Sequence, residues 1–374
     1  MKIYVSLVIV LLLTNCKPEK KVEKEIIENK NDFAFYVGTY TEKESKGIYK
    51  YLLEENGNLK KVGLAVASNN PSFLALSDDK KYLLAVNEVN RDSIGFIESY
   101  KIDKDSLQLI SRASSGGAHP CFVAINEEGF VVAANYTGGN VGLLKLDASG
   151  KLSDVLDVQQ HEGKGTTDRQ EGPHAHSAWF EKDNQNNIIA VDLGTNELWF
   201  SKIDTLLNKL IPTNKLAMAE GAGPRHIAFN PNKNIVYVLD ELDNTITVIS
   251  KSETGTYEIM NTISTLPEGF SEYSKAADIH ISSDGKFVYA SNRGHDSIAI
   301  FSVQDDDGSL ALLGLESTKG KNPRNFSLSP DDSYLIVANQ DTDNLVSFKR
   351  NPETGLLTFI SEIEAPTPVC ILFN

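Results

Sequence analysis

Five of the seven histidines in this sequence occupy one kind of position, which makes them the first candidates for chemistry. They lie beside a recurring anchor residue, often proline, that opens an apolar run. They are His119, His174, His176, His226 and His280. An imidazole can accept and return a proton near neutral pH, so histidines gathered at one place would suit general acid–base chemistry.

A second set of candidates combines positive charge with one carboxylate. Arg225 and Arg324 follow two of the anchors, Arg293 and Glu241 end or follow apolar runs, and Arg169 lies in a long polar loop. Guanidinium groups bind anionic groups bidentately and can stabilise charge that develops on a carbonyl oxygen. A carboxylate or an imidazole can take a proton from water. Together these groups suit hydrolysis, or closure, of an ester ring in an anionic sugar acid.

A repeated phrase indicates how residues so distant in the chain could meet. Each copy contains an anchor, an apolar run, a polar turn and a second apolar run, and copies recur roughly every 50 residues. The anchors are Pro71, Pro120, Pro173, Pro224, Asp278, Pro323 and Pro368. Each copy supplies four strand-length runs, which in the first copy are Phe73–Ser77, Tyr82–Asn87, Ile94–Ile102 and Leu107–Ala113. The pattern predicts an all-β, seven-bladed β-propeller with little helix.

The two ends of the repeat array predict how the ring closes. The last copy has a single strand, Val369–Phe373. Three unmatched strands precede the first copy, at Phe33–Thr39, Gly47–Leu53 and Leu59–Ala67. One C-terminal strand and three N-terminal strands would complete the seventh blade, and this arrangement removes exposed sheet edges.

The hairpin within each copy predicts where the functional residues meet. A tight turn joins the first two strands, so the start of the first and the end of the second lie at the same end of the blade. Seven blades would bring these positions around one central opening. Besides the histidines and arginines above, they include Cys121, Asn325, Tyr40, Glu88, Tyr136, Leu193 and Gln340. Two long loops, 159–176 and 266–280, should reach the same rim, as should His161 and His295.

The N-terminus looks like an export signal with a lipid anchor. An apolar segment, Ile3 to Leu13, follows Lys2 and is too short to span a bilayer comfortably. Leu13-Thr14-Asn15-Cys16 resembles a bacterial lipobox. We therefore expect residues 1–15 to be a lipoprotein signal peptide, Cys16 to be lipidated, 16–31 to be a charged tether and 32–374 to form the propeller. An uncleaved anchor or an ordinary signal peptide is the alternative.

The net charge of the chain limits the classes of partner it can bind, and the positions of its cysteines indicate whether they form a disulfide. A net charge of −15 argues against a nucleic-acid surface. We expect a monomer that acts on a small molecule and touches a membrane only through its anchor. Cys121 and Cys370 fall in copies that should not be neighbours, so two buried free thiols are expected rather than a disulfide.

Less specific interpretations of the same residues remain open. Each histidine could simply hydrogen-bond neighbouring backbone. Arg293 with Asp296, or Arg225 with Glu241, could form a structural ion pair. A histidine cluster could bind zinc, although no HExxH pairing is present and we predict neither a metal nor a cofactor. No GxSxG nucleophile elbow and no phosphate-binding loop occur in the sequence.

Several phrases resemble the seven-bladed propeller lactonase family, which includes 6-phosphogluconolactonases and carboxy-muconate lactonizing enzymes. The resemblance runs from about Phe33 to the C-terminus, and its most specific phrase is Ala276-ADIHISSDGKFVYASNRGHDSI. Further matches are Tyr36-VGTYT, Gly172-PHAHSAWF, Gly223-PRHIAFNPN and Tyr237-VLDELDNTITV.

The resemblance implies a lactone hydrolase or cyclase that requires no metal. By matching motifs, the family's proposed catalytic residues fall on His176, Arg225, Glu241 and Arg293. We take Glu241 or His176 as the group that activates water, Arg225 as the oxyanion donor and Arg293 as the holder of a substrate acid group. Substrate contacts are expected from His174, His226, His280, Arg169, Tyr40, Glu88, Tyr136 and Arg324.

Two departures from the family pattern carry expectations of their own. The family often has Asn where this chain has Asp240, and the added negative charge should raise the pKa of Glu241. The export signal favours a substrate other than a cytoplasmic phosphogluconolactone. Alternative functions are a non-catalytic propeller that binds sugar acids or partners, a scaffold that uses only its rim, and a lactonizing cyclase.

Overall fold

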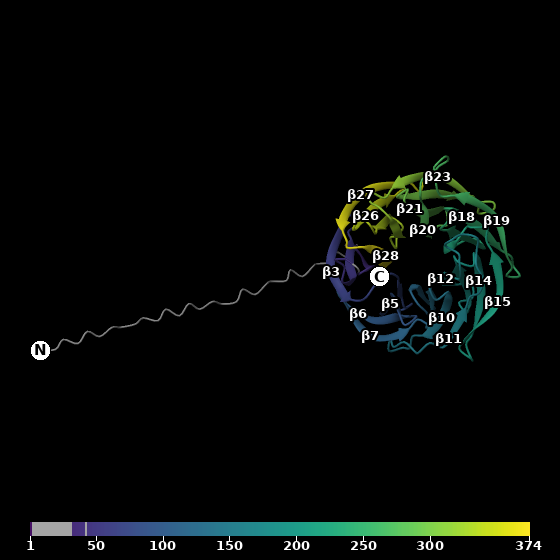
Figure 1. Ribbon diagram of the computed structural model, residues 1–374. Helices are drawn as coiled ribbons and strands as arrows, with labels where there is room; N and C mark the ends of the chain where they lie inside the picture. Colours follow the sequence, from purple (N-terminus) through teal and green to yellow (C-terminus); the bar gives the residue numbers. More distant parts are fainter. Residues whose placement is uncertain (2–31, 42) are drawn as a thin grey trace.

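The computed structural model describes residue 1, residues 32–41 and residues 43–374, and its strands form a ring of blades (Figure 1). In this described part of the chain there are seven four-stranded antiparallel sheets and no helix. The predicted seven-bladed β-propeller is therefore confirmed. The expected signal peptide, Cys16 and the tether 16–31 lie outside the described residues, apart from Met1.

The seven innermost strands line the centre of the ring (Figure 1), and each begins within three residues of its anchor. They are β4 (Leu74–Leu76), β8 (Pro120–Ile125), β12 (Ala175–Phe180), β16 (Pro224–Phe229), β20 (Lys275–Ile281), β24 (Pro323–Leu328) and β28 (Pro368–Phe373). The second strands are β5 (Tyr82–Arg91), β9 (Phe130–Asn135), β13 (Asn187–Asp192), β17 (Ile235–Asp240), β21 (Phe287–Arg293), β25 (Tyr334–Asn339) and β1 (Phe33–Thr39).

The third and fourth strands of each blade lie progressively further from the centre (Figure 1). The third strands are β6 (Ile94–Asp103), β10 (Asn140–Lys145), β14 (Glu197–Asp204), β18 (Thr245–Lys251), β22 (Ser297–Val303), β26 (Asn344–Arg350) and β2 (Gly47–Leu53). The outermost strands are β7 (Ser106–Ser114), β11 (Asp157–Gln160), β15 (Lys209–Ala217), β19 (Tyr257–Ser264), β23 (Leu310–Ser317), β27 (Leu357–Glu364) and β3 (Leu59–Ala67).

The ring closes between the C-terminal strand and the N-terminal strands. β28 pairs antiparallel with β1 and completes the sheet β28-β1-β2-β3. The pairing brings Phe35 opposite Phe373, with ring centroids 5.2 Å apart. This is the predicted closure, and it leaves no innermost strand without a partner in its blade.

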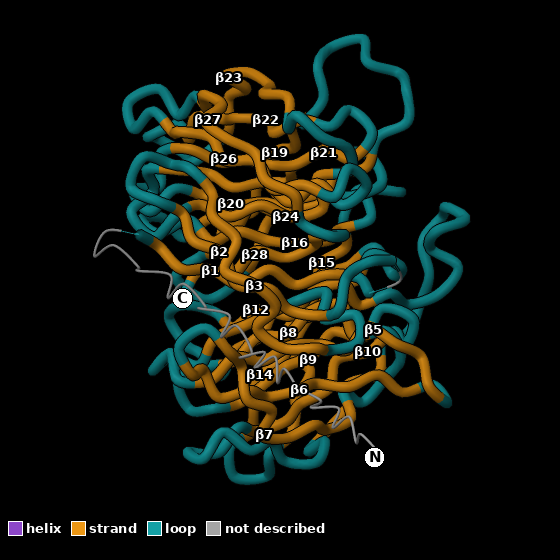
Figure 2. The backbone as a smooth tube through the Cα atoms, turned by 90° about the vertical axis from the view of Figure 1, so that its left-hand side faces the viewer, coloured by secondary structure: helices purple, strands orange, loops and turns teal. Residues whose placement is uncertain are grey.

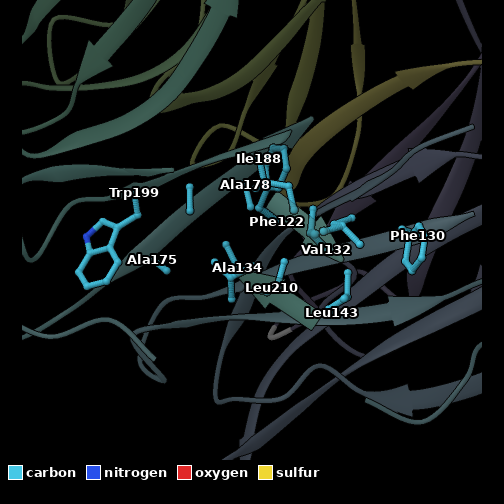
Figure 3. Packing of buried hydrophobic residues seen from close by; sticks show 13 residues of the cluster. Phe122, Phe130, Val132, Ala134, Leu143, Ala175, Ala178, Ile188, Trp199 and Leu210 are labelled. Carbon is cyan, nitrogen blue, oxygen red and sulfur yellow. The ribbon is translucent and has the colours of Figure 1, made fainter. Parts of the chain in front are cut away.

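The core consists of apolar layers between neighbouring blades. Figure 3 shows one of them, where Phe122 and Val132 from the second blade meet Ile188 and Ala178 from the third. Val, Ile and Phe dominate because both faces of each sheet are covered, so few positions along the inner strands can be polar. Cys121 and Cys370 are buried free thiols, which confirms the expectation from the sequence.

Hairpin register fixes which residues share an end of the ring. Strands run between two loop-bearing faces (Figure 2). The first and second strands of a blade pair so that Pro224 lies opposite Asp240 and Lys275 opposite Arg293. The turn that joins the first two strands lies at the other end of each blade. In the second blade this turn is tight: Gly129 has φ 81°, and a Cβ there would lie 2.6 Å from the Leu146 carbonyl oxygen. Arg225 and Glu241 therefore emerge side by side.

No helix among the described residues has the length and apolar character needed to cross a membrane.

Candidate active site

A polar cavity of about 240 Å³ opens at the end of the ring where the inner strands begin. Its lining comes from strand starts, from the ends of second strands and from the two long loops. The lining residues are Glu88, Cys121, Tyr136, Arg169, His176, Glu241, Tyr273, Lys275, Arg293 and Arg324. Seven of the twelve catalytic and substrate-binding residues predicted from the sequence line this cavity, as the repeat geometry requires: Glu88, Tyr136, Arg169, His176, Glu241, Arg293 and Arg324.

Glu241 lies at the centre of an arginine cluster. Its Oε2 accepts hydrogen bonds from Arg225 Nε at 3.0 Å and pairs with Arg293 Nη2 at 2.9 Å. Arg169 Nη1 lies 3.8 Å from its Oε1. Arg225 and Arg293 also donate to the backbone carbonyls of Ala277 and Ala276, which fixes both guanidinium planes. The arrangement holds three cations around one buried carboxylate.

The arginines decide the charge state of this carboxylate. Burial alone would raise the pKa of Glu241, but the charges of Arg293 and Arg225 outweigh burial and lower it to about 2. Burial and the neighbouring Arg293 and Arg324 in turn lower the pKa of Arg225 to about 10. At neutral pH the cluster therefore contains ionised Glu241, which is a weak proton acceptor.

The expectation that Asp240 raises the pKa of Glu241 was wrong. Asp240 is fully buried, and its Oδ2 accepts hydrogen bonds from Thr247 and Thr245. Burial raises the pKa of Asp240 well above its usual range and so favours its neutral form, and Asp240 is not among the groups that shift the pKa of Glu241. The arginines then dominate the electrostatics of the neighbouring glutamate.

His176 enters the cavity as a neutral imidazole. Burial and the nearby Arg225 hold the pKa of His176 well below its ordinary value of 6.5. Its Nδ1 lies 3.8 Å from the Cys121 sulfur, whose thiol also contacts the His176 carbonyl at 3.3 Å. Burial raises the pKa of Cys121, so this cysteine stays a thiol. No other side chain in the described residues hydrogen-bonds the imidazole of His176, which leaves its Nε2 without a protein partner.

A second polar network forms the opposite wall of the cavity. Arg324 Nη2 donates to the Tyr40 hydroxyl at 2.8 Å, and that hydroxyl donates to Glu88 Oε2 at 2.8 Å. Ser72 donates to the same oxygen. Tyr40 does not line the cavity, but it joins two residues that do. On the loop side, Arg169 Nη2 donates to the Tyr136 hydroxyl at 2.6 Å.

With this geometry in view, the sequence was compared with known proteins. It matches the family described as "Lactonase, 7-bladed beta-propeller" over residues 34–373. The chain belongs to that family. Membership confirms the prediction of an enzyme of the lactone-hydrolase type.

Relatives of known name cover nearly the whole chain. A protein of Bacillus subtilis (strain 168) named 6-phosphogluconolactonase is 38% identical over 344 residues, which are 90% of this chain and 97% of that protein. A Formosa agariphila protein of the same name is 34% identical over 339 residues, 86% of this chain and 94% of that one. Among solved structures, the periplasmic gluconolactonase of Pseudomonas aeruginosa has a TM-score of 0.87 at 29% identity, covering 91% of this chain and 99% of that one.

Several residues predicted for this propeller lactonase site lie beside the cavity rather than in its wall. His174 stacks on Tyr136 with ring centroids 4.5 Å apart and contacts Glu171. His226 and His280 both hydrogen-bond Asp278, through His226 Nδ1 at 2.8 Å and His280 Nε2 at 3.0 Å. Asp278 also accepts from Asn325. These hydrogen bonds to Asp278 join the inner strands β16, β20 and β24 next to Arg225.

His226 makes the folded state sensitive to acid. Burial and Arg225 lower its pKa to about 4, whereas an unfolded histidine titrates near 6.5. Stability from neutral His226 is therefore complete above pH 6.5 and is lost as pH falls from 6.5 to 4, at about 1.4 kcal/mol per pH unit.

A His226→Asn variant keeps a donor toward Asp278 but has no imidazole to titrate. We expect its free energy of unfolding to fall less steeply over that pH range than that of the wild type, by about the slope of one proton. Urea unfolding at closely spaced pH values measures the slope of the free energy of unfolding against pH for the wild type and the variant. The contributions of other titrating groups cancel when one slope is subtracted from the other. Equal slopes would show that His226 is protonated alike in both states.

The two loop histidines expected at the rim differ in role. His161 is 1% exposed, hydrogen-bonds Asp192 at 2.7 Å and stacks on Trp199, so it is part of the fold. His295 contacts Ser297 and packs edge-on against Phe270. Neither lines the cavity. Of the two structural ion pairs considered from the sequence, Arg225 with Glu241 is present, while Arg293 with Asp296 is not among the ion pairs of the described residues.

Two cavity residues were not singled out from the sequence. Tyr273 and Lys275 both line the cavity, and Tyr273 is 73% exposed at its rim. Tyr273 lies in the long loop predicted over 266–280, and Lys275 opens β20 within the same range, so the length of this segment was a signal that its individual residues did not give. Within residues 32–41 and 43–374, no group of three or more His, Cys, Asp or Glu side chains is placed to hold a metal ion.

Proposed function

We propose that the chain hydrolyses the lactone of an anionic sugar acid by direct attack of water on the ring carbonyl. The observation that carries the proposal is a concentration of positive charge in an acidic protein. Arg169, Lys275, Arg293 and Arg324 line the cavity against only Glu88 and Glu241, while the whole chain has a net charge of −15. Such a cavity attracts an anionic substrate and repels cations.

The arginines have two tasks in this reaction. Attack of water converts the planar carbonyl into a tetrahedral oxyanion, and a guanidinium fixed in place stabilises that charge without reorganising. We assign this task to Arg225, which is 3% exposed and held by Glu241. Arg293 is assigned to a carboxylate or phosphate on the substrate, because a guanidinium binds such groups bidentately. Positive charge from arginine would thus polarise the carbonyl without a metal ion.

A panel of lactones followed by pH-stat tests the proposal, because ring opening releases a proton at neutral pH. We expect turnover of gluconolactone-type rings, with preference for those that carry an acid group. Spontaneous opening is subtracted with protein that has been heat-denatured. Equal binding of lactone and opened acid without conversion would instead favour a sugar-acid-binding propeller.

We also propose that the chain is an exported lipoprotein, attached to a membrane through Cys16. The lipobox-like residues 13–16 support this location, as does the relative in Pseudomonas aeruginosa whose name places it in the periplasm. Changing Cys16→Ser is expected to release the protein from the membrane fraction, because lipidation requires the thiol. Immunoblotting of membrane and soluble fractions measures the shift. An unchanged distribution would contradict a lipid anchor.

A further inference from the structure

Lactone hydrolysis at this site needs a group that takes a proton from water, and the two residues first considered are poorly suited. Glu241 is bound by Arg225 and Arg293 and has a pKa of about 2. His176 is buried, and its pKa is held well below 6.5. A general base works best when the pKa of its conjugate acid lies near the working pH, so each of these groups would accept a proton only weakly.

Glu88 differs from Glu241 in its surroundings. It is half-buried near the end of β5 and lines the cavity. Its Oε2 is fixed by hydrogen bonds from the hydroxyls of Tyr40 and Ser72. Among the ion pairs of the described residues none includes Glu88, and no donor there hydrogen-bonds its Oε1. One oxygen is therefore held in place while the other is available to a ligand or to water.

A second, smaller cavity adjoins Glu88. It has a volume of about 10 Å³, close to the least that holds one water molecule. Glu88, Cys121 and Arg324 line both this space and the larger cavity, and Ser72 and Asn325 add polar atoms to its wall. A water molecule at this junction would contact the Glu88 carboxylate on one side and a substrate carbonyl on the other.

We propose that Glu88 is the general base of the reaction and that it acts on a water molecule held where the two cavities meet. This inference rests on the proposed lactone hydrolysis. One O–H bond of the water breaks, its proton moves to Glu88 Oε1, and the oxygen forms a bond to the carbonyl carbon while the π electron pair of the C=O bond moves onto the carbonyl oxygen as an oxyanion. That electron pair re-forms the C=O bond in the next step. The acyl C–O bond of the ring then breaks with its electron pair on the ring oxygen, which takes the proton back from Glu88. The new carboxylic acid ionises to solvent.

The Tyr40 contact gives this base a second useful property. Arg324 donates to Tyr40, and Tyr40 donates to Glu88, so the cation stabilises the carboxylate through a hydroxyl rather than by a direct ion pair. The hydroxyls of Tyr40 and Ser72 thereby fix the orientation of the carboxylate. Tyr40 is thus a positioning residue for Glu88.

The decisive variants are Glu88→Gln and Glu88→Ala, measured on a lactone that the wild type opens. Glu88→Gln is nearly isosteric, and we expect kcat to fall about 100-fold or more with KM changed little, as for loss of a general base. In Glu88→Ala, added formate should restore a substantial part of the lost kcat, because a small carboxylate can occupy the space of the side chain. Formate should not accelerate the wild type. Glu127→Gln, on an exposed hairpin turn at the other end of the ring, is the matched control and should retain full activity.

Each result has a defined meaning. A Glu88→Gln enzyme with the kcat of the wild type overturns the proposal, as does a loss of kcat in Glu88→Ala that formate does not restore, because a merely structural role would give that pattern. Circular dichroism and thermal melting check folding, and Glu88→Asp, which keeps a carboxylate, replaces Glu88→Gln if the latter unfolds; Asp should then retain more kcat than Ala. If the wild type opens no lactone at all, the proposed function itself is wrong.

Discussion

An Arg293→Ala enzyme is expected to lose about 100-fold or more in kcat/KM on lactones that carry an acid group, mainly through a higher KM. Arg293 is 14% exposed in its side chain, and its Nη2 reaches both Glu241 and the Ala276 carbonyl. The residue lines a cavity with an excess of positive charge. Truncation removes a fixed guanidinium partner for the substrate anion, and the ammonium of Lys275, which lines the same cavity, lacks the planar fork that binds such a group.

Comparison of two substrates makes this prediction specific. A neutral lactone of the same ring size should lose far less with Arg293→Ala than its acidic counterpart, because only the latter uses the guanidinium. Arg293→Lys should lie between Ala and wild type, since lysine keeps the charge but not the planar fork. Arg112→Ala is the control: Arg112 packs on Phe96 at the outer edge of a blade, and its loss should leave kcat/KM unchanged. Equal losses on both substrates would remove Arg293 from substrate binding.

The fold could be predicted from the sequence because each repeat of the sequence corresponds to one blade with the same burial requirements. Each copy must bury both faces of its sheet, so its inner strands have near-continuous apolar runs between turn residues. The unmatched strand Val369–Phe373 and the three strands before Pro71 left only one way to close the ring, and β28 pairs with β1 as expected. Hairpin register then brings Arg225 and Glu241 together without any knowledge of the site.

What the sequence could not supply were distances and charge states. The sequence placed Arg225, Arg293 and Glu241 at one opening. It could not show that both guanidiniums contact the same oxygen of Glu241, because that depends on the conformations of three long side chains. The expected effect of Asp240 was wrong because this side chain is fully buried, and burial raises its pKa despite the hydrogen bond from Thr247. Two acidic residues that are adjacent in the sequence do not predict each other's pKa when burial decides whether one of them ionises.

Five histidines lie beside the anchors, but this position alone does not predict which of them line the cavity. His176 lines the cavity, whereas His226 and His280 bind Asp278 and build a polar hub beneath it. All three follow anchors, so the repeat alone cannot separate them. His280 hydrogen-bonds Asp278 on its own strand, β20, whereas His226 receives the same carboxylate from the neighbouring blade, a contact that appears only in the three-dimensional ring.

The arginine cluster also makes a prediction about stability. Replacing Glu241 by alanine is expected to lower the free energy of unfolding by about 3–5 kcal/mol, because Arg225 and Arg293 would be left as buried charges without their shared partner. Turnover should fall as well, since Arg225, the proposed oxyanion donor, loses the contact with Glu241 that orients its guanidinium. Urea unfolding followed by fluorescence measures the first effect, and kcat/KM of the folded fraction measures the second.

Added anion separates the electrostatic cause from a packing defect in the Glu241→Ala protein. Phosphate or sulfate can enter the space of the lost carboxylate and pair with the same arginines, so it should stabilise the variant more than the wild type. Sodium chloride at equal ionic strength controls for screening. Glu253→Ala, in an exposed turn on the opposite end of the ring, should change neither stability nor its response to phosphate. If Glu241→Ala is as stable as the wild type, the three arginines do not depend on this carboxylate, and its central place in the site would have to be explained by catalysis alone.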